Sequence, residues 1–268
     1  MSVAFSVLMS VYAREKPAFL QASLQSLVDQ LEPAEQVVLV KDGALPPELE
    51  AVIAAFNDLL PLDFCALPTN QGLAVALNEG LQLCRHNWVA RMDSDDIALP
   101  ERFSTQSAFL NKHPDVDVLG ACIEERDASM TQVLARREVP CAYADIKRFA
   151  KRRSPVSHPV VVFRKSAVLA VGGYPLFQRA QDYALWSLLL VRGYRFANQP
   201  ECLLWMRTGE GLMARRGYQH FLNELKLLRF QREIGLLSRF DYALNVIARF
   251  ALRVVPDRLK KLLYKVAR

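Results

Sequence analysis

The sequence predicts an α/β fold: a mixed, mostly parallel sheet flanked by helices and followed by a helical tail. The first 100 residues support this, because short apolar, β-prone segments alternate there with segments of helical periodicity. Such alternation is typical of parallel strands joined by right-handed crossovers. Residues 219–268 instead combine apolar and basic side chains at helical spacing, which indicates the tail.

Four strands are expected in the first part of the chain, at Phe5–Val11, Gln36–Val40, Asp63–Leu67 and Trp88–Met92. Apolar residues at helical spacing separate them, and the first helix opens at Pro17, a residue favoured in the first helical turn. The later helices are expected to begin near Leu49 and Leu73.

The second part is less regular. Strands or extended segments are expected at Val116–Ile123, Thr131–Val139, His158–Arg164 and Tyr194–Met206. Helices are expected at Ala144–Arg153 and Gln181–Val191, and from Gln219 onward with breaks near Gly235 and at Pro256.

Composition narrows the class of protein. The 268 residues are 51% hydrophobic and 23% charged, which suits one large globular domain with a small appendage. Five scattered cysteines without a CxxC pair indicate buried thiols in a reducing cytosol. The N-terminus lacks the basic flank of a signal peptide, and no apolar run is long enough for a membrane span. A cytoplasmic protein is therefore expected.

Three of the expected strands end in polar segments: Tyr12–Arg14, Lys41–Gly43 and Asp93–Asp96. In parallel sheets, ligands bind beyond the carboxyl ends of the strands. These segments are therefore expected to meet at one edge of the sheet and to form a binding site there.

Asp93 and Asp95 form a DxD motif directly after an apolar strand. Closely spaced carboxylates repel one another unless a cation holds them, and they suit Mg²⁺ or Mn²⁺ completed by substrate phosphates. The alternative is a solvated loop that caps the helix opening at Pro100. Placement at a strand end favours the metal site.

Each of the other polar residues can be interpreted in two ways. Asp42 can accept a hydrogen bond from the imide N–H of uracil or can form an Asp-Gly turn. Asn70 faces a nucleotide or belongs to a loop before a helix. Asp182 is a general base or a favourable charge in a first helical turn. His158 lines a site or is a structural histidine, and Arg215 binds phosphates or lies in a solvated basic loop.

Taken in order, the segments SVLMSVY, VVLVKDG, NQGLAVALNEG, MDSDDIALPER and GGY…QDYALW resemble glycosyltransferase family 2 and its GT-A fold, a Rossmann-like α/β fold. The resemblance covers roughly the first 210 residues. It is most similar to the bacterial polysaccharide branch, with amylovoran- and O-antigen-type sugar transferases.

The resemblance implies roles for individual residues. Asp42 matches the uracil-binding aspartate, Asp93 and Asp95 match the metal-binding DxD, and Asp182 matches the general base. Tyr12 matches the segment near the nucleotide base. Further contacts are expected from Asn70, Asn78 and Arg215 on the donor side and from His158, Gln181 and Trp186 on the acceptor side.

Two positions depart from the family pattern. Gln181 replaces the first acid of the Glu-Asp pair, and Leu77 stands before Asn78 where the family often has an arginine. The resemblance further implies a catalytic domain at 1–218 with a nucleotide-binding half at 1–100 and an acceptor-binding half at 101–218, and the helical pattern places the tail at 219–268.

The implied reaction is an inverting transfer from a UDP-sugar to a polyprenyl-diphosphate-linked saccharide, in O-antigen or exopolysaccharide biosynthesis, with Mg²⁺ or Mn²⁺ as cofactor. Two alternatives are a non-catalytic subunit that binds nucleotide-sugars and a nucleotidyltransferase. The second would show a glycine-rich phosphate loop after its first strand, which SVYAREK is not.

The tail suggests where the acceptor is presented. Between Arg239 and Arg268, apolar positions interleave with basic ones, and only Asp241 and Asp257 oppose the positive charge. Such helices bind peripherally to the anionic inner face of a membrane. The alternatives are packing on the catalytic domain or pairing with a second copy in a homodimer. A nucleic-acid partner is not expected, because the basic helices lack an aromatic stacking platform.

Overall fold

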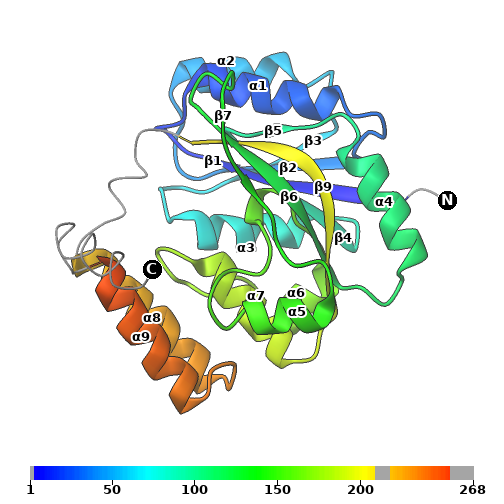
Figure 1. Ribbon diagram of the computed structural model, residues 1–268. Coiled ribbons are helices and arrows are strands. Elements are labelled where there is room, and N and C mark those ends of the chain that lie inside the picture. The colour runs from blue at the N-terminus through cyan, green and yellow to red at the C-terminus, as the bar shows by residue number, and fades with distance from the viewer. Residues whose placement is uncertain (1–2, 209–217, 254–268) are drawn as a thin grey trace. The chain divides into compact units, whose positions relative to one another are not determined.

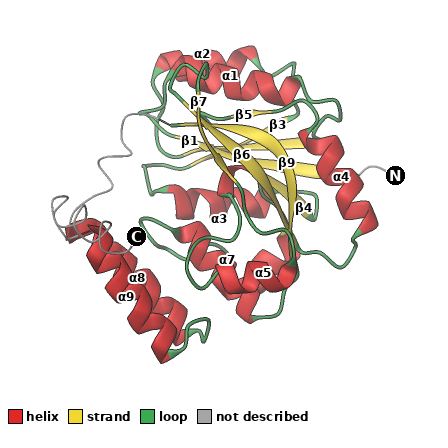
Figure 2. Ribbon diagram, in the orientation of Figure 1, coloured by secondary structure: helices red, strands yellow, loops and turns green. Residues whose placement is uncertain are grey.

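The computed structural model describes residues 3–208 and 218–253. The chain divides into two compact units, Met1–Thr208 and Gly209–Arg268. In the first unit, helices cover both faces of one twisted sheet (Figure 1). Its strand order is β3-β2-β1-β4-β8-β6-β9-β5, with β7 paired to β6. The predicted mixed α/β architecture is confirmed (Figure 2).

The first four strands are parallel, as predicted. They are β1 (Phe5–Val11), β2 (Gln36–Lys41), β3 (Leu62–Ala66) and β4 (Trp88–Asp93). The crossovers are α1 (Pro17–Val28), α2 (Pro47–Ala55) and α3 (Leu73–Leu83). Gly80 lets α3 approach the sheet closely, because a Cβ there would lie 2.6 Å from a Leu8 methyl and 2.4 Å from a Val40 methyl.

The register brings the three polar strand ends together. Val11 of β1 pairs with Lys41 of β2, and Ser10 pairs with Asp93 of β4 on the other side. Asp42 continues the β2 ladder by donating its N–H to the Val11 carbonyl at 2.9 Å. The expected meeting of these ends at one edge of the sheet is confirmed.

The rest of the first unit mixes strand directions. β6 runs parallel to β9 and antiparallel to β7 and β8. The strands are β5 (Ile97–Ala98), β6 (Val118–Arg126), β7 (Val133–Arg137), β8 (Val162–Arg164) and β9 (Phe196–Arg207). The helices are α4 (Arg102–Lys112), α5 (Tyr143–Phe149), α6 (Lys165–Ala170) and α7 (Gln181–Val191).

Strand β5 was not expected, the helix expected to reach Arg153 ends at Phe149, and two further differences have a clear physical reason. The segment expected as one strand at His158–Arg164 is a 3₁₀ turn, His158–Val160, followed by the short β8, because Pro159 cannot donate a ladder hydrogen bond. Helix α6 was not expected, since its six residues are too few for a helical period to emerge.

Alternating side chains of β1 fill two cores. Val7 and Met9 belong to the cluster beneath α1, α2 and α4, whereas Leu8 belongs to the cluster beneath α3, α5, α6 and α7. The sheet is therefore buried on both faces, so polar groups gather where its strands end.

The second unit contains α8 (Tyr218–Glu233) and α9 (Arg239–Arg253). The chain turns between them at Gly235, whose φ of +86° lies in the left-handed region, close to the expected break. Arg249 pairs with Glu224 at 2.9 Å, and the Phe221 and Phe250 rings lie 5.6 Å apart. The break expected at Pro256 lies outside the described residues. None of the helices described is both long enough and apolar enough to cross a membrane.

Candidate functional site

The acidic loop after β4 rests on two buried arginines. Arg91, inside β4, is fully buried; it donates a hydrogen bond to the Leu8 carbonyl at 3.2 Å and pairs with the Asp93 carboxylate. Arg102, at the start of α4, is also fully buried and donates to the Arg91 carbonyl at 2.7 Å. Burial and the neighbouring Arg91 lower the pKa of Arg102 to about 9. The loop is thus held against fixed positive charge.

The carboxylates of this loop bind protons more readily than usual. Burial, followed by the charges of Asp93 and Glu15, raises the pKa of Asp95 to about 7. Burial also raises the pKa of Asp96 well above its usual range. Asp96 is 1% exposed; its Oδ1 accepts the Arg207 N–H at 2.8 Å, and its Oδ2 has no partner among the residues described. Each shift indicates negative charge that its surroundings do not fully compensate.

Arg207 and Glu15 complete the surroundings of this loop. The Arg207 guanidinium donates to the Asp95 carbonyl at 2.9 Å, lies 3.9 Å from the Phe19 ring centroid and bonds the Ala128 carbonyl. Glu15 accepts the Ser94 hydroxyl at 2.6 Å. Glu15 directly follows the polar segment Tyr12–Arg14, but it was not itself predicted as part of the site. Tyr12 itself is 44% exposed.

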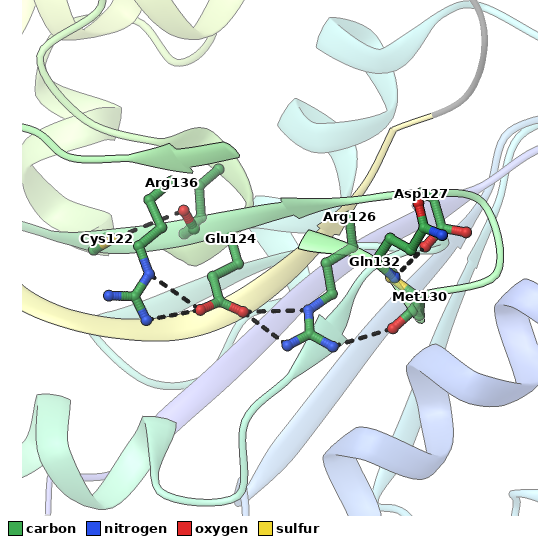
Figure 3. A network of polar contacts seen from close by, with 8 residues as sticks. Cys122, Glu124, Arg126, Asp127, Met130, Gln132 and Arg136 are labelled. Atoms are coloured by element: carbon green, nitrogen blue, oxygen red, sulfur yellow. Dashed lines mark hydrogen bonds and ion pairs between the residues drawn. The ribbon is translucent and has the colours of Figure 1, made fainter. Parts of the chain in front are cut away.

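The β6–β7 hairpin borders the site through Ala128 at its tip. Figure 3 shows Glu124 between two arginines, with Arg126 at 2.8 Å and Arg136 at 2.9 Å. These hydrogen bonds hold the pKa of Glu124 below its usual value. Arg126 also donates to the Met130 carbonyl at 3.1 Å and stacks 3.6 Å from the Trp205 ring centroid. The network ties the hairpin to β9, which carries Arg207.

At the end of β2, Asp42 binds backbone groups of the chain. Its two oxygens accept the Gln71 N–H at 2.7 Å and the Gly72 N–H at 3.0 Å, just before α3 begins. The Asn70 amide donates to Asp42 Oδ2 at 3.1 Å. Asp42 and Asn70 therefore form one loop-stabilising unit beside β1.

His158, which was expected on the acceptor side, lies among aromatic side chains. Its Nε2 lies 3.1 Å from the Tyr174 hydroxyl. Burial and the charge of Arg91 lower the pKa of His158 to about 4, while Asp182 and Asp93 act in the opposite direction. The charges of Asp93, at the end of β4, and of Asp182, in the first turn of α7, thus both influence this imidazole.

The remaining predicted residues lie deeper or elsewhere. Trp186 is fully buried and packs in the core beneath the site, 6.2 Å from the ring centroids of His158 and Phe163. Gln181 is buried at the start of α7. Asn78 binds the backbone of Tyr174. Arg215 lies outside the described residues.

The carboxylate oxygens after β4 suit a divalent cation whose remaining ligands are water and substrate phosphates. Among the described residues, no three His, Cys, Asp or Glu side chains gather into a chelating group. Mg²⁺, however, usually binds one or two carboxylates, several waters and substrate phosphates. Asp95 and the unpartnered Oδ2 of Asp96 provide carboxylate oxygens of this kind.

Comparison with known sequences gives consistent matches. The profile of glycosyl transferase family 2 matches residues 6–171. The Erwinia amylovora amylovoran biosynthesis glycosyltransferase AmsE is 38% identical over 97% of this chain and 98% of its own length. An Escherichia coli UDP-Gal:alpha-D-GlcNAc-diphosphoundecaprenol beta-1,3-galactosyltransferase is 34% identical over 97% and 95%. An uncharacterized glycosyltransferase of Haemophilus influenzae is 40% identical over 97% of each chain.

Solved structures share the fold at lower identity. Staphylococcus aureus TarS 1-349 in complex with UDP-GlcNAc superposes with a TM-score of 0.71 at 19% identity, covering 93% of this chain and 73% of that chain. A Pyrobaculum calidifontis mannosyltransferase in complex with GDP-Man and Mn²⁺ gives 0.65 at 16% identity, covering 100% and 80%.

Proposed function

Because this chain belongs to glycosyltransferase family 2, we propose that it transfers a sugar from a UDP-sugar to a lipid-linked saccharide in cell-surface polysaccharide biosynthesis. The names of the E. coli and Erwinia relatives support the donor, the diphosphate-lipid acceptor and the pathway class. What supports the proposal within this site is that the charges of Asp93 and Asp182 both act on the buried His158–Tyr174 pair.

On the donor side, Asp95 would hold Mg²⁺ or Mn²⁺ as predicted, and Asp96 would be its neighbour in place of the predicted Asp93, which pairs with Arg91. When bound, the cation neutralises charge that grows on the departing diphosphate. Asp42 and Asn70 hold the loop at the start of α3, next to which the uracil ring is proposed to bind. Tyr12, exposed at the end of β1, packs near that ring.

On the acceptor side, Asp182 acts as the general base. Its carboxylate removes the proton from an acceptor hydroxyl as the oxygen forms a bond to the anomeric carbon. The bond from that carbon to the diphosphate breaks on the opposite face, and its electron pair leaves with UDP. The configuration at the anomeric carbon is therefore inverted.

The reaction can be tested with a panel of UDP-sugars and a synthetic N-acetylglucosaminyl-diphospholipid, by measuring UDP release with Mn²⁺. Asp182→Asn is expected to lower kcat about 10³-fold while UDP affinity stays unchanged, because the base acts only in the transition state. Near-normal transfer by this variant would remove Asp182 from the base role. UDP release that does not depend on the lipid would indicate donor hydrolysis.

We propose further that the second unit holds the enzyme peripherally at the inner face of the membrane. Phe240, Leu244 and Ile247 lie on one side of α9, and Phe240 and Ile247 are 72% and 66% exposed. An exposed apolar face next to basic residues suits an anionic lipid surface, where a lipid-linked acceptor is presented.

This attachment predicts flotation with phosphatidylglycerol vesicles and weaker flotation with phosphatidylcholine vesicles. Ile247→Glu should reduce flotation, because it places a charge on the apolar face. Leu176→Glu is a matched control, since Leu176 is 75% exposed but belongs to the first unit. Equal flotation of both variants would contradict the attachment. Dimer formation that Ile247→Glu abolishes would assign this face to a second copy.

A further inference from the structure

The Asn78 side chain binds the backbone of the turn that precedes Asp182, the proposed base. Its amide nitrogen donates to the Tyr174 carbonyl at 2.9 Å, and its amide oxygen accepts the Tyr174 N–H at 2.7 Å. This two-way contact joins α3, on the donor side, to the connection between α6 and α7. Both polar atoms of the Asn78 side chain are thereby directed at Tyr174, 96 residues away in sequence.

The turn is shaped around this contact. Gly173 has a φ of +79°, and a Cβ there would lie 2.5 Å from Asn78 Oδ1. Gly172 has a similar φ of +92°, but a Cβ there would meet nothing within 4 Å. The two adjacent glycines therefore share the left-handed conformation and differ in their contact with Asn78.

The Tyr174 side chain anchors the same turn from the other side. It is buried, its hydroxyl contacts His158, and its ring packs edge-on against His158 and Phe163. The chain then runs eight residues to Asp182. Helix α7 begins there after Ala180, which has a φ of +61° and makes no side-chain capping bond. The start of α7 thus lacks a side-chain cap; within the helix the Tyr183 hydroxyl bonds the Ala150 carbonyl at 2.6 Å, and before the helix the Tyr174 turn is the anchored point.

We infer that Asn78 is a positioning residue that sets the place of Asp182 relative to the donor by holding the Gly173–Tyr174 turn. The inference rests on the proposed role of Asp182. This role differs from direct contact with the sugar donor, since both polar atoms of the Asn78 side chain bond the Tyr174 backbone. Its signature is a loss of kcat without a loss of nucleotide affinity, because misplacing a catalytic group affects the transition state alone.

The test uses the full-length protein with Mn²⁺, UDP affinity by calorimetry, and kcat from UDP release in the presence of the lipid acceptor. Asn78→Ala is expected to lower kcat about 10- to 100-fold with UDP affinity unchanged. Gly173→Ala should have the same effect, because its methyl group displaces Asn78. Gly172→Ala is the matched control, and it should leave kcat well above that of Gly173→Ala. Retained UDP affinity also shows that each variant is folded.

The double variant Asn78→Ala/Gly173→Ala sharpens the test. Its kcat should be no lower than that of Gly173→Ala, because the atom that the methyl group would strike is gone. Weaker UDP binding by Asn78→Ala with unchanged kcat would overturn the inference in favour of a donor contact. Unchanged kcat and affinity would also overturn it. If Asp182→Asn retains activity, the base assignment fails instead, whatever Asn78 does.

Discussion

The ends of β2 and β4 lie on either side of β1, and the aspartates that follow them differ in their hydrogen bonds. At the β2 end, both oxygens of Asp42 accept backbone N–H groups. At the β4 end, Asp96 is equally buried but has one bonded oxygen, and the pKa values of Asp95 and Asp96 are raised. One carboxylate is satisfied by the fold, whereas the others retain capacity for a ligand.

The difference teaches what each strand end does. A carboxylate that accepts several N–H groups stabilises the loop that it caps, and its charge is compensated without help. Carboxylates crowded over buried arginines remain under-compensated, which favours a cation. The β2 end is accordingly a structural support, and we propose the β4 end as the place where the cation binds.

The largest effect is expected from Asp95→Ala. If the β4 end binds the cation of the diphosphate, turnover should fall roughly 10³-fold, since such charge stabilisation is worth several kcal/mol. Added Mn²⁺ should no longer stabilise the variant in thermal melts, although it stabilises the wild-type protein. Normal metal-dependent turnover in this variant would contradict the assignment of the cation to the β4 end.

A second effect concerns the pH dependence of stability, to which His158 near the β4 end contributes. Because the pKa of His158 is lowered to about 4, the unfolded chain binds more protons between pH 4 and 6.5. The contribution of His158 to stability is complete above about pH 6.5 and falls by about 3 kcal/mol toward pH 4. The free energy of unfolding should therefore decrease with acidification in this window.

His158→Gln isolates this contribution, since glutamine can still bond the Tyr174 hydroxyl but does not titrate. The raised pKa values of Asp95 and Asp96 act in the opposite direction, and subtracting the variant's pH profile from that of the wild type removes them. Parallel profiles from denaturant titrations would show that this region is well solvated.

Periodicity was sufficient to predict the parallel part of the sheet and the ends of its strands. Alternating apolar strands and helices specify parallel neighbours, and parallel neighbours place their carboxyl ends together. Asp42, Asp93 and Asp95 follow from that logic alone. The family resemblance then identified Asp182, which no local pattern distinguishes from an ordinary charge at a helix start.

Arg91 and Glu15 were not predicted as supporting residues, and Asn78 was expected to contact the donor and not the Tyr174 backbone. Arg91 stands inside an apolar strand, and a charge in such a place is the one signal that could have singled it out. Glu15 and Asn78 carry no local signal. Their partners, Ser94 and Tyr174, lie 79 and 96 residues away, so the contacts exist only after the sheet is assembled. Trp186 was assigned to the acceptor side, but its helix position directs it into the core.

A smaller effect is expected from Asp42→Asn. The amide keeps one acceptor oxygen, but its NH₂ group then faces a backbone N–H of Gln71 or Gly72. Loss of one hydrogen bond to a charged acceptor should cost about 2 kcal/mol of stability. Urea unfolding would measure it. A variant as stable as the wild type would mean that the loop does not depend on Asp42.

The smallest effect is expected from the matched change Asp96→Asn. Asn Oδ1 can still accept the Arg207 N–H, and the new NH₂ group occupies the place of an oxygen that has no partner among the described residues. Replacing an uncompensated buried charge by a neutral amide should therefore change stability by less than about 1 kcal/mol. Urea unfolding of Asp96→Asn and Asp42→Asn side by side then compares the two strand ends directly. Equal losses would show that Asp96 is held by the fold as firmly as Asp42, and would leave Asp95 alone to bind the cation.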